Sequence, residues 1–139
     1  MDSQGKDEEG DHVQGSQRLQ DWISGGETRR LAGYDVFVRT AVTPGRPPLL
    51  LIHGYPTASY DWVRVWPRLA ARYSLYSLDL LGFGLSAKPT DTDYPIALQA
   101  DLCMALLDDS GVTNAHVLAH DYGDTVAQEL LARHNEGSL

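Results

Sequence analysis

The segment VLAHDYGDT, residues 117–125, has the spacing of a sharp turn from a strand into a helix. The small residues Ala119 and Gly123 let the chain bend tightly, so that the side chain of Asp121 stands at the apex of the turn. The amide of Tyr122 begins the following helix, where unpaired backbone N–H groups favour a developing negative charge. We therefore interpret Asp121 as a candidate nucleophile and the Tyr122 amide as one half of an oxyanion hole.

A second turn offers another amide. The segment LLIHGYPT, residues 50–57, indicates a strand that ends in a tight His-Gly turn. If the strands before the two turns are neighbours in one sheet, the backbone N–H of Tyr55 faces the same point as that of Tyr122. The alternative for Asp121 is a helix N-cap without chemistry. The second turn favours the nucleophile.

The segments that must position these turns alternate between strand and helix patterns. The prediction is a hairpin at 28–42, strands at 49–52, 75–80 and 115–120, and helices at 59–73 (divided at Pro67), between Pro95 and Gly111, and after Asp121. This order predicts a parallel sheet with right-handed crossovers. The last strand is expected to be a long, apolar and unprotected edge, and self-association through it is expected.

Composition narrows the class of protein. The chain has 139 residues, 42% of them apolar, and its net charge of −8 argues against nucleic acid and anionic membranes as partners. The single cysteine, Cys103, excludes an internal disulfide and a cysteine metal cluster, and we expect it to be buried. Residues 1–18 are predicted to be a disordered acidic tail. Neither a membrane span nor a signal peptide is indicated, so we expect a cytoplasmic protein without a metal or organic cofactor.

Three motifs together resemble a known superfamily. They are HGYPTASYDW (53–62), LDLLGFGLSAKP (78–89) and HDYGDTVAQELL (120–131). In this order they resemble the α/β-hydrolase superfamily, in particular the branch of haloalkane dehalogenases, epoxide hydrolases and mesoderm-specific-transcript-like proteins. The resemblance covers about residues 20–135. It implies an α/β-hydrolase fold.

The branch also explains why a carboxylate stands at the apex of the turn. A serine must lose a proton before it attacks, whereas an aspartate is already ionised at neutral pH. The resemblance implies that Asp121 displaces a leaving group, halide or epoxide oxygen, from a saturated carbon of a small apolar substrate. The product is an ester on Asp121. Water then hydrolyses this ester while the amides of Tyr55 and Tyr122 hold the oxyanion.

Several parts of the family pattern are not found in this sequence. The base histidine, its acidic partner and the lid follow the nucleophile in the family, yet only His134 follows Asp121 here, about 20 Å along the same helix. We expect residues 19–139 to be the N-terminal part of a hydrolase domain, truncated after the nucleophile helix and without a lid. Such a chain would form an alkyl-enzyme and stop. The alternative is a non-catalytic binding or interaction protein that keeps the scaffold.

Substrate preference is less well defined by the motifs. Haloalkane dehalogenases usually place asparagine and tryptophan where this sequence has Tyr55 and Tyr122, whose hydroxyl groups could donate instead. The form HDYGD most resembles the mesoderm-specific-transcript-like group, which implies no particular substrate.

Four further polar residues lie near the turns. The resemblance implies that Asp79 orders the loop after its strand. His53 is expected to make a fixed structural contact within its turn, and His120 is expected to pack behind the sheet. For Asp124 two interpretations stay open: a helix-start charge that faces solvent or an amide, or a neighbour that raises the pKa of Asp121.

Overall fold

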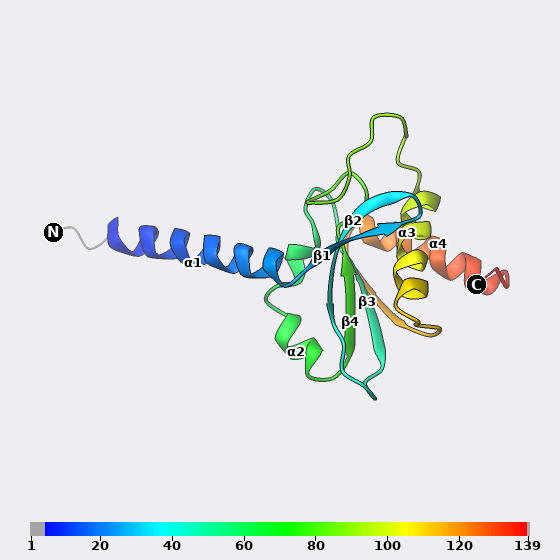
Figure 1. Ribbon diagram of the computed structural model, residues 1–139, viewed down its shortest axis with the longest axis horizontal. Coiled ribbons are helices and arrows are strands. Elements are labelled where there is room, and N and C mark those ends of the chain that lie inside the picture. Colours follow the sequence, from blue (N-terminus) through cyan, green and yellow to red (C-terminus); the bar gives the residue numbers. More distant parts are fainter. Residues whose placement is uncertain (1–4, 139) are drawn as a thin grey trace.

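A mixed sheet covered by helices on both faces forms the body of the protein (Figure 1). The computed structural model describes residues 5–138. The elements in chain order are α1 (Gly5–Ser24), β1 (Glu27–Leu31), β2 (Tyr34–Ala41), β3 (Pro48–Ile52), η1 (Ser59–Trp62), α2 (Trp66–Ala70), β4 (Ser74–Leu78), α3 (Ile96–Asp109), β5 (His116–Ala119) and α4 (Tyr122–Asn135). No helix among the described residues combines the length and the apolar character that a bilayer crossing requires.

The strand order in the sheet is β1-β2-β4-β3-β5. β3 pairs in parallel with both β4 and β5, which confirms the predicted parallel strands and makes the two turns neighbours. The hairpin of β1 and β2 is antiparallel, and β2 continues the sheet by pairing antiparallel with β4. The expectation of a long last strand is corrected, because β5 has only four residues. The alternating order of strands and helices therefore produces the α/β arrangement that the sequence predicted.

Two apolar layers, one on each face of the sheet, hold the fold together. Leu50 and Ile52 of β3 point toward the layer beneath α3 and α4. Leu49 and Leu51 point to the other face, where they pack with Trp22 and residues of α2. Because successive side chains of a strand alternate between faces, a continuous apolar run is what a strand buried on both sides needs.

The helical segment predicted over 59–73 is two short elements. Residues Ser59–Trp62 form the 3-10 helix η1, and α2 begins at Trp66 with Pro67 in its first turn. Proline has no N–H to donate and is tolerated only where a helix begins, so the predicted division at Pro67 is confirmed.

The helix α1 projects from the sheet toward the N-terminus (Figure 1). Its backbone is helical from Gly5 onward, whereas the composition predicted a disordered acidic tail over residues 1–18; residues 1–4 lie outside the described part. Helical hydrogen bonds are local, so a helix can form in a segment of polar composition. Anchoring is at the other end, where Trp22 is buried and the Arg39 guanidinium donates to the Trp22 carbonyl. The boundary at residue 18 stays a prediction.

The hairpin turn between β1 and β2 offers a test of backbone strain. Ala32 and Gly33 form its two-residue loop, and both have positive φ, 49° and 87°. Such turns favour asparagine followed by glycine, because a left-handed conformation is costly for alanine. We expect Ala32→Asn to raise the free energy of unfolding by about 1 kcal/mol in urea denaturation. Gly33→Ala should lower it, and equal stability of all three chains would contradict this account.

Candidate active site

Asp121 occupies the apex of the sharp turn between β5 and α4. Its backbone is at φ 54° and ψ −119°, a conformation that costs energy for any residue other than glycine. The turn leaves the side chain exposed at the carboxyl end of the parallel strands. Parallel α/β sheets bind their ligands at this edge, so Asp121 stands where chemistry is expected.

Two backbone amides converge on one oxygen of this carboxylate. The N–H of Tyr55 donates to Oδ1 of Asp121 at 3.0 Å, and the N–H of Tyr122 donates to the same oxygen at 2.7 Å. Tyr55 lies 66 residues earlier in the chain and reaches this point because β3 and β5 are adjacent. The two amides therefore face the same point, as the sequence predicted. Among the described residues, no group donates a hydrogen bond to Oδ2, and the residue as a whole is exposed.

These hydrogen bonds also set the charge of the site. Donation by the Tyr55 amide, followed by that of the Tyr122 amide, holds the pKa of the Asp121 carboxyl below its ordinary value. The carboxylate is therefore ionised at neutral pH. The interpretation in which Asp124 raises the pKa of Asp121 is not supported, because this pKa is lowered and only burial acts to raise it. The Asp124 side chain is exposed at the start of α4.

Two glycines allow the turns to approach each other. A Cβ atom on Gly54 would lie 2.7 Å from Cβ of Asp121, and one on Gly123 would lie 2.3 Å from the carbonyl oxygen of Ile52. Both distances are shorter than van der Waals contact. The glycines of the Asp-Tyr-Gly and His-Gly sequences therefore allow the backbones of the two turns to pack closely.

Comparison with known proteins agrees with this geometry. A family model described as alpha/beta hydrolase fold matches residues 47–137, which include both turns and the strands before them.

The chain belongs to the α/β-hydrolase-fold family.

Individual relatives show which members of this family the chain resembles. The human mesoderm-specific transcript homolog protein is 42% identical over 126 residues, which are 87% of this chain and 38% of that protein. The putative hydrolase LipZ of Mycobacterium tuberculosis is 40% identical over 125 residues, 89% of this chain and 42% of that protein. The crystal structure of a loop variant of the haloalkane dehalogenase DbeA from Bradyrhizobium elkanii superposes with a TM-score of 0.71 at 35% identity, covering 78% of this chain and 35% of that one. The chain thus spans about two fifths of the length of the curated relatives.

Aromatic rings lie around the sharp turn between β5 and α4. The central ring is that of Phe83, a residue that the sequence motifs did not single out. The ring of Phe83 lies edge-on to Tyr55, with 6.1 Å between centroids, and 5.7 Å from the ring of Tyr122. The centroid of the Phe83 ring also lies 5.2 Å from that of the His53 ring. The only signal was its place between two glycines in LLGFG. Phe83 forms an apolar wall beside the carboxylate.

The two tyrosines whose amides donate to Asp121 differ in the position of their side chains. Tyr55 is 69% exposed, so its hydroxyl is available to a molecule bound at the turn. The ring of Tyr122 packs on the apolar core, and its hydroxyl lies beside the buried Gln99. Burial raises the pKa of the Tyr122 hydroxyl, which keeps it protonated. Of the two hydroxyl groups that were expected to be able to donate to a leaving group, only that of Tyr55 is therefore in a position to do so.

His53 is a structural residue, as expected. It is fully buried, and its Nε2 accepts a hydrogen bond from the Leu80 amide at 2.9 Å. The proton must therefore be on Nδ1, which donates to the Gly54 carbonyl at 2.8 Å. Both ring nitrogens are occupied, so this imidazole has no role as a base.

Burial lowers the pKa of His53 below its ordinary value, and this links folding to pH. The unfolded chain, with a histidine pKa of about 6.5, gains the proton first, so stability is full above that pH and falls as pH decreases below it. We expect the urea midpoint to be lower at about pH 5.5 than at pH 7.5. His116→Gln, which changes an exposed histidine, should keep this pH dependence. An unchanged midpoint in the parent chain would contradict the assignment.

Neither His120 nor His134 is placed to act as a base for Asp121. His120 is exposed and lies just past the end of β5, which corrects the expectation that it packs behind the sheet. Its ring makes no hydrogen bond to Asp121 among the described residues. His134 is near the far end of α4, as expected from the sequence. The described residues also contain no group of three side chains suited to hold a metal ion.

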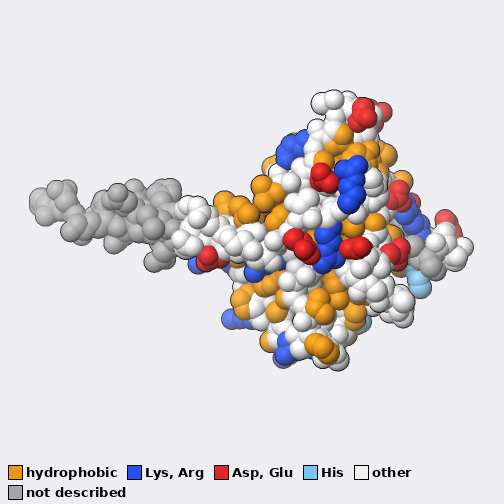
Figure 2. Space-filling view, viewed as in Figure 1, with side chains coloured by type: hydrophobic (Ala, Val, Ile, Leu, Met, Phe, Trp, Pro, Cys, Tyr) orange, Lys and Arg blue, Asp and Glu red, His pale blue; other side chains and the backbone are white. Residues whose placement is uncertain are grey.

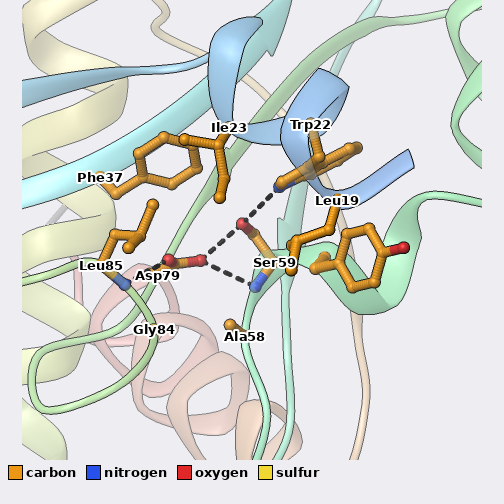
Figure 3. Close-up of a pocket in the computed structure, with 10 residues that line it drawn as sticks. Leu19, Trp22, Ile23, Phe37, Ala58, Ser59, Asp79, Gly84 and Leu85 are labelled. Carbon is orange, nitrogen blue, oxygen red and sulfur yellow. Dashed lines mark hydrogen bonds between the residues drawn. The ribbon is translucent and has the colours of Figure 1, made fainter. Parts of the chain in front are cut away.

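Asp79 orders the loop after β4, as the resemblance implied. Its Oδ1 accepts hydrogen bonds from the amide and hydroxyl of Ser59 at 2.9 and 2.5 Å, and Oδ2 accepts from the Leu85 amide at 2.9 Å. Ser59 in turn accepts from the Trp22 indole (Figure 3). These groups form the floor of a cavity of about 230 Å³ that Asp121 does not line. Its walls are Leu19, Trp22, Ile23, Phe37, Ala58, Tyr60, Gly84 and Leu85.

Proposed function

We propose that Asp121 is the nucleophile of a hydrolase reaction that passes through an alkyl-enzyme ester. The observation that carries this proposal is the unequal environment of the two carboxylate oxygens. Oδ1 accepts hydrogen bonds from two amides, whereas Oδ2 of this exposed residue accepts none among the described residues. A helix cap alone needs only the Tyr122 amide. The second donor, from a turn 66 residues away, is what an oxyanion hole requires.

Each oxygen then has a distinct part in the reaction. Oδ2 attacks a saturated carbon, a carbon–oxygen bond forms, and the leaving group departs with the electron pair of its bond to that carbon. Oδ1 becomes the carbonyl oxygen of the ester. When water attacks Cγ, negative charge develops on Oδ1, where the amides of Tyr55 and Tyr122 already point. The donors are in place before the reaction, so little reorganisation is needed.

A small haloalkane is the substrate class that we propose. Halide leaves as a stable anion without a proton, whereas an epoxide oxygen needs an acid, and the Tyr122 hydroxyl is turned toward Gln99. The apolar wall of Phe83 suits an alkyl group. The similarity to a haloalkane dehalogenase structure supports this choice. An epoxide, with the exposed Tyr55 hydroxyl as the acid, is the second candidate.

The second half of the reaction needs a base that removes a proton from water. Neither ring nitrogen of His53 is free, and His134 lies too far along α4. We therefore propose that the 139-residue chain carries out the alkylation step and does not turn over.

Mass spectrometry of the intact chain tests this proposal. Incubation with 1-iodobutane should attach one butyl group to Asp121 and release one equivalent of iodide, after which the reaction should stop. Peptide mapping locates the ester, and hydroxylamine should remove it. Continued iodide release would show that turnover is complete without a further base. Absence of any adduct on Asp121 would favour the alternative, a non-catalytic interaction protein.

A further inference from the structure

A buried glutamine, Gln99, lies in the first turn of α3. Charged residues of this helix are paired at the surface: Asp101 with Arg133, and Asp109 with Arg29. Figure 2 shows acidic and basic side chains intermixed over the part of the surface where β1 and α3 run. The other buried residues of α3 are apolar and include the cysteine that was expected to be buried: Ala100, Leu102, Cys103, Leu106 and Leu107. An amide side chain on this apolar face needs hydrogen-bond partners in the core.

The side-chain amide of Gln99 makes two hydrogen bonds to the backbone of one residue. The Leu81 N–H donates to Oε1 of Gln99 at 2.9 Å, and Nε2 of Gln99 donates to the Leu81 carbonyl at 2.9 Å. Leu81 is fully buried and lies in the loop that follows β4. Buried backbone groups without partners cost free energy, so Gln99 takes the place that a neighbouring strand would have.

The loop that Gln99 holds contacts both turns of the candidate site. The N–H of Leu80 donates to Nε2 of His53, which belongs to the His-Gly turn. The ring centroid of Phe83 lies 5.7 Å from that of Tyr122, which begins α4 after the sharp turn. By fixing the backbone between these two contacts, Gln99 restrains both turns at once.

Gln99 also lies beside the side chain of Tyr122. A glutamine amide has two N–H donors and two lone pairs on its oxygen, and Leu81 uses one of each. The Tyr122 hydroxyl lies next to this amide group. The backbone N–H of Tyr122 donates to Oδ1 of Asp121, and it is attached to the same Cα as the ring. A ring that is held at both ends therefore restrains the direction of this N–H.

We propose that Gln99 is a positioning residue of the candidate active site. One buried side chain restrains the loop that contacts both turns and the tyrosine whose amide donates to Asp121. The consequence for catalysis rests on the proposed function, in which the two amides stabilise charge on Oδ1. The alternative is a side chain that only satisfies the backbone of Leu81 and leaves the amides where they are.

The pKa of the Asp121 carboxyl distinguishes these two roles. Donation by the amides of Tyr55 and Tyr122 lowers this pKa, so a loss of their alignment should raise it. His120 is a charged group that also lowers it, and Asp124 is exposed in the first turn of α4. Both groups stay in place when the contacts of Gln99 are changed.

NMR titration of the carboxyl carbons tests the proposal. Gln99→Met keeps the length of the side chain but removes its amide, and the pKa of Asp121 should rise to near the ordinary value of about 3.9. Tyr122→Phe keeps the two hydrogen bonds to Leu81 and removes only the hydroxyl, so it should give part of this rise. The double variant should not exceed Gln99→Met alone, because both changes break one connection.

Leu106→Ala is the matched control for stability. It removes buried contacts about two turns further along α3, so it should lower the free energy of unfolding and leave the pKa of Asp121 unchanged. An unchanged pKa in Tyr122→Phe, or an equal rise in Leu106→Ala, would overturn the proposal. The titration needs no substrate, so failure of the parent chain to react with 1-iodobutane would refute the proposed reaction alone.

Discussion

Replacing Asp121 by asparagine is expected to lower the rate of alkylation by 1-iodobutane by at least about a thousandfold. The amide nitrogen or oxygen that takes the place of Oδ2 is a much weaker nucleophile than a carboxylate. The other position can keep a carbonyl oxygen, which still accepts from the amides of Tyr55 and Tyr122. The turn should therefore persist. Intact mass measured over time gives the rate for both chains.

The matched control is Asp124→Asn. This carboxylate is also exposed in the first turn of α4 but lies outside the pair of amides, so the alkylation rate should change by no more than about threefold. The parent chain should also react at a constant rate from about pH 8 to pH 5, because the lowered pKa keeps Asp121 ionised over this range. Adduct formation at an undiminished rate in Asp121→Asn would place the reaction on another residue.

Gly123→Ala is expected to lower the free energy of unfolding by about 3 kcal/mol. In most helices alanine is more stable than glycine by up to about 1 kcal/mol, so helix propensity predicts the opposite sign. Packing prevails here because the added methyl group would lie 2.3 Å from the Ile52 carbonyl oxygen and 2.6 Å from that of His53. Both atoms are backbone and cannot rotate away. Denaturation in urea measures the loss.

Gly15→Ala provides the comparison, since a Cβ at that position in α1 would meet no atom within 4 Å. It should leave the domain's stability unchanged or raise it slightly.

Separation of the β5–α4 turn from the His-Gly turn by Gly123→Ala should also slow alkylation, because the Tyr55 amide would no longer reach Asp121. If Gly123→Ala unfolds at the same urea concentration as the parent chain, the close approach of the two backbones is not needed for folding.

The sequence alone determined the strands, the parallel direction of β3, β4 and β5, and the position of the sharp turn at Asp121. The apolar run of β3 and the alternation of strand and helix patterns are local signals, and they lead to a parallel arrangement because crossover connections have a preferred hand. Small residues beside Asp121 predicted the turn for the same local reason. The meeting of Tyr55 and Asp121 could be predicted only on the condition that β3 and β5 are neighbours.

The tertiary structure decided which atoms are free to react. Two amides occupy Oδ1, Phe83 stands between the two tyrosines, and the Tyr122 hydroxyl turns toward the core. These features depend on side-chain packing between segments far apart in the chain, which no pattern of neighbouring residues encodes. Exposure of His120 and the antiparallel pairing of β2 with β4 have the same origin. Periodicity reports which face of an element is buried, whereas contacts across the sheet determine what each side chain touches.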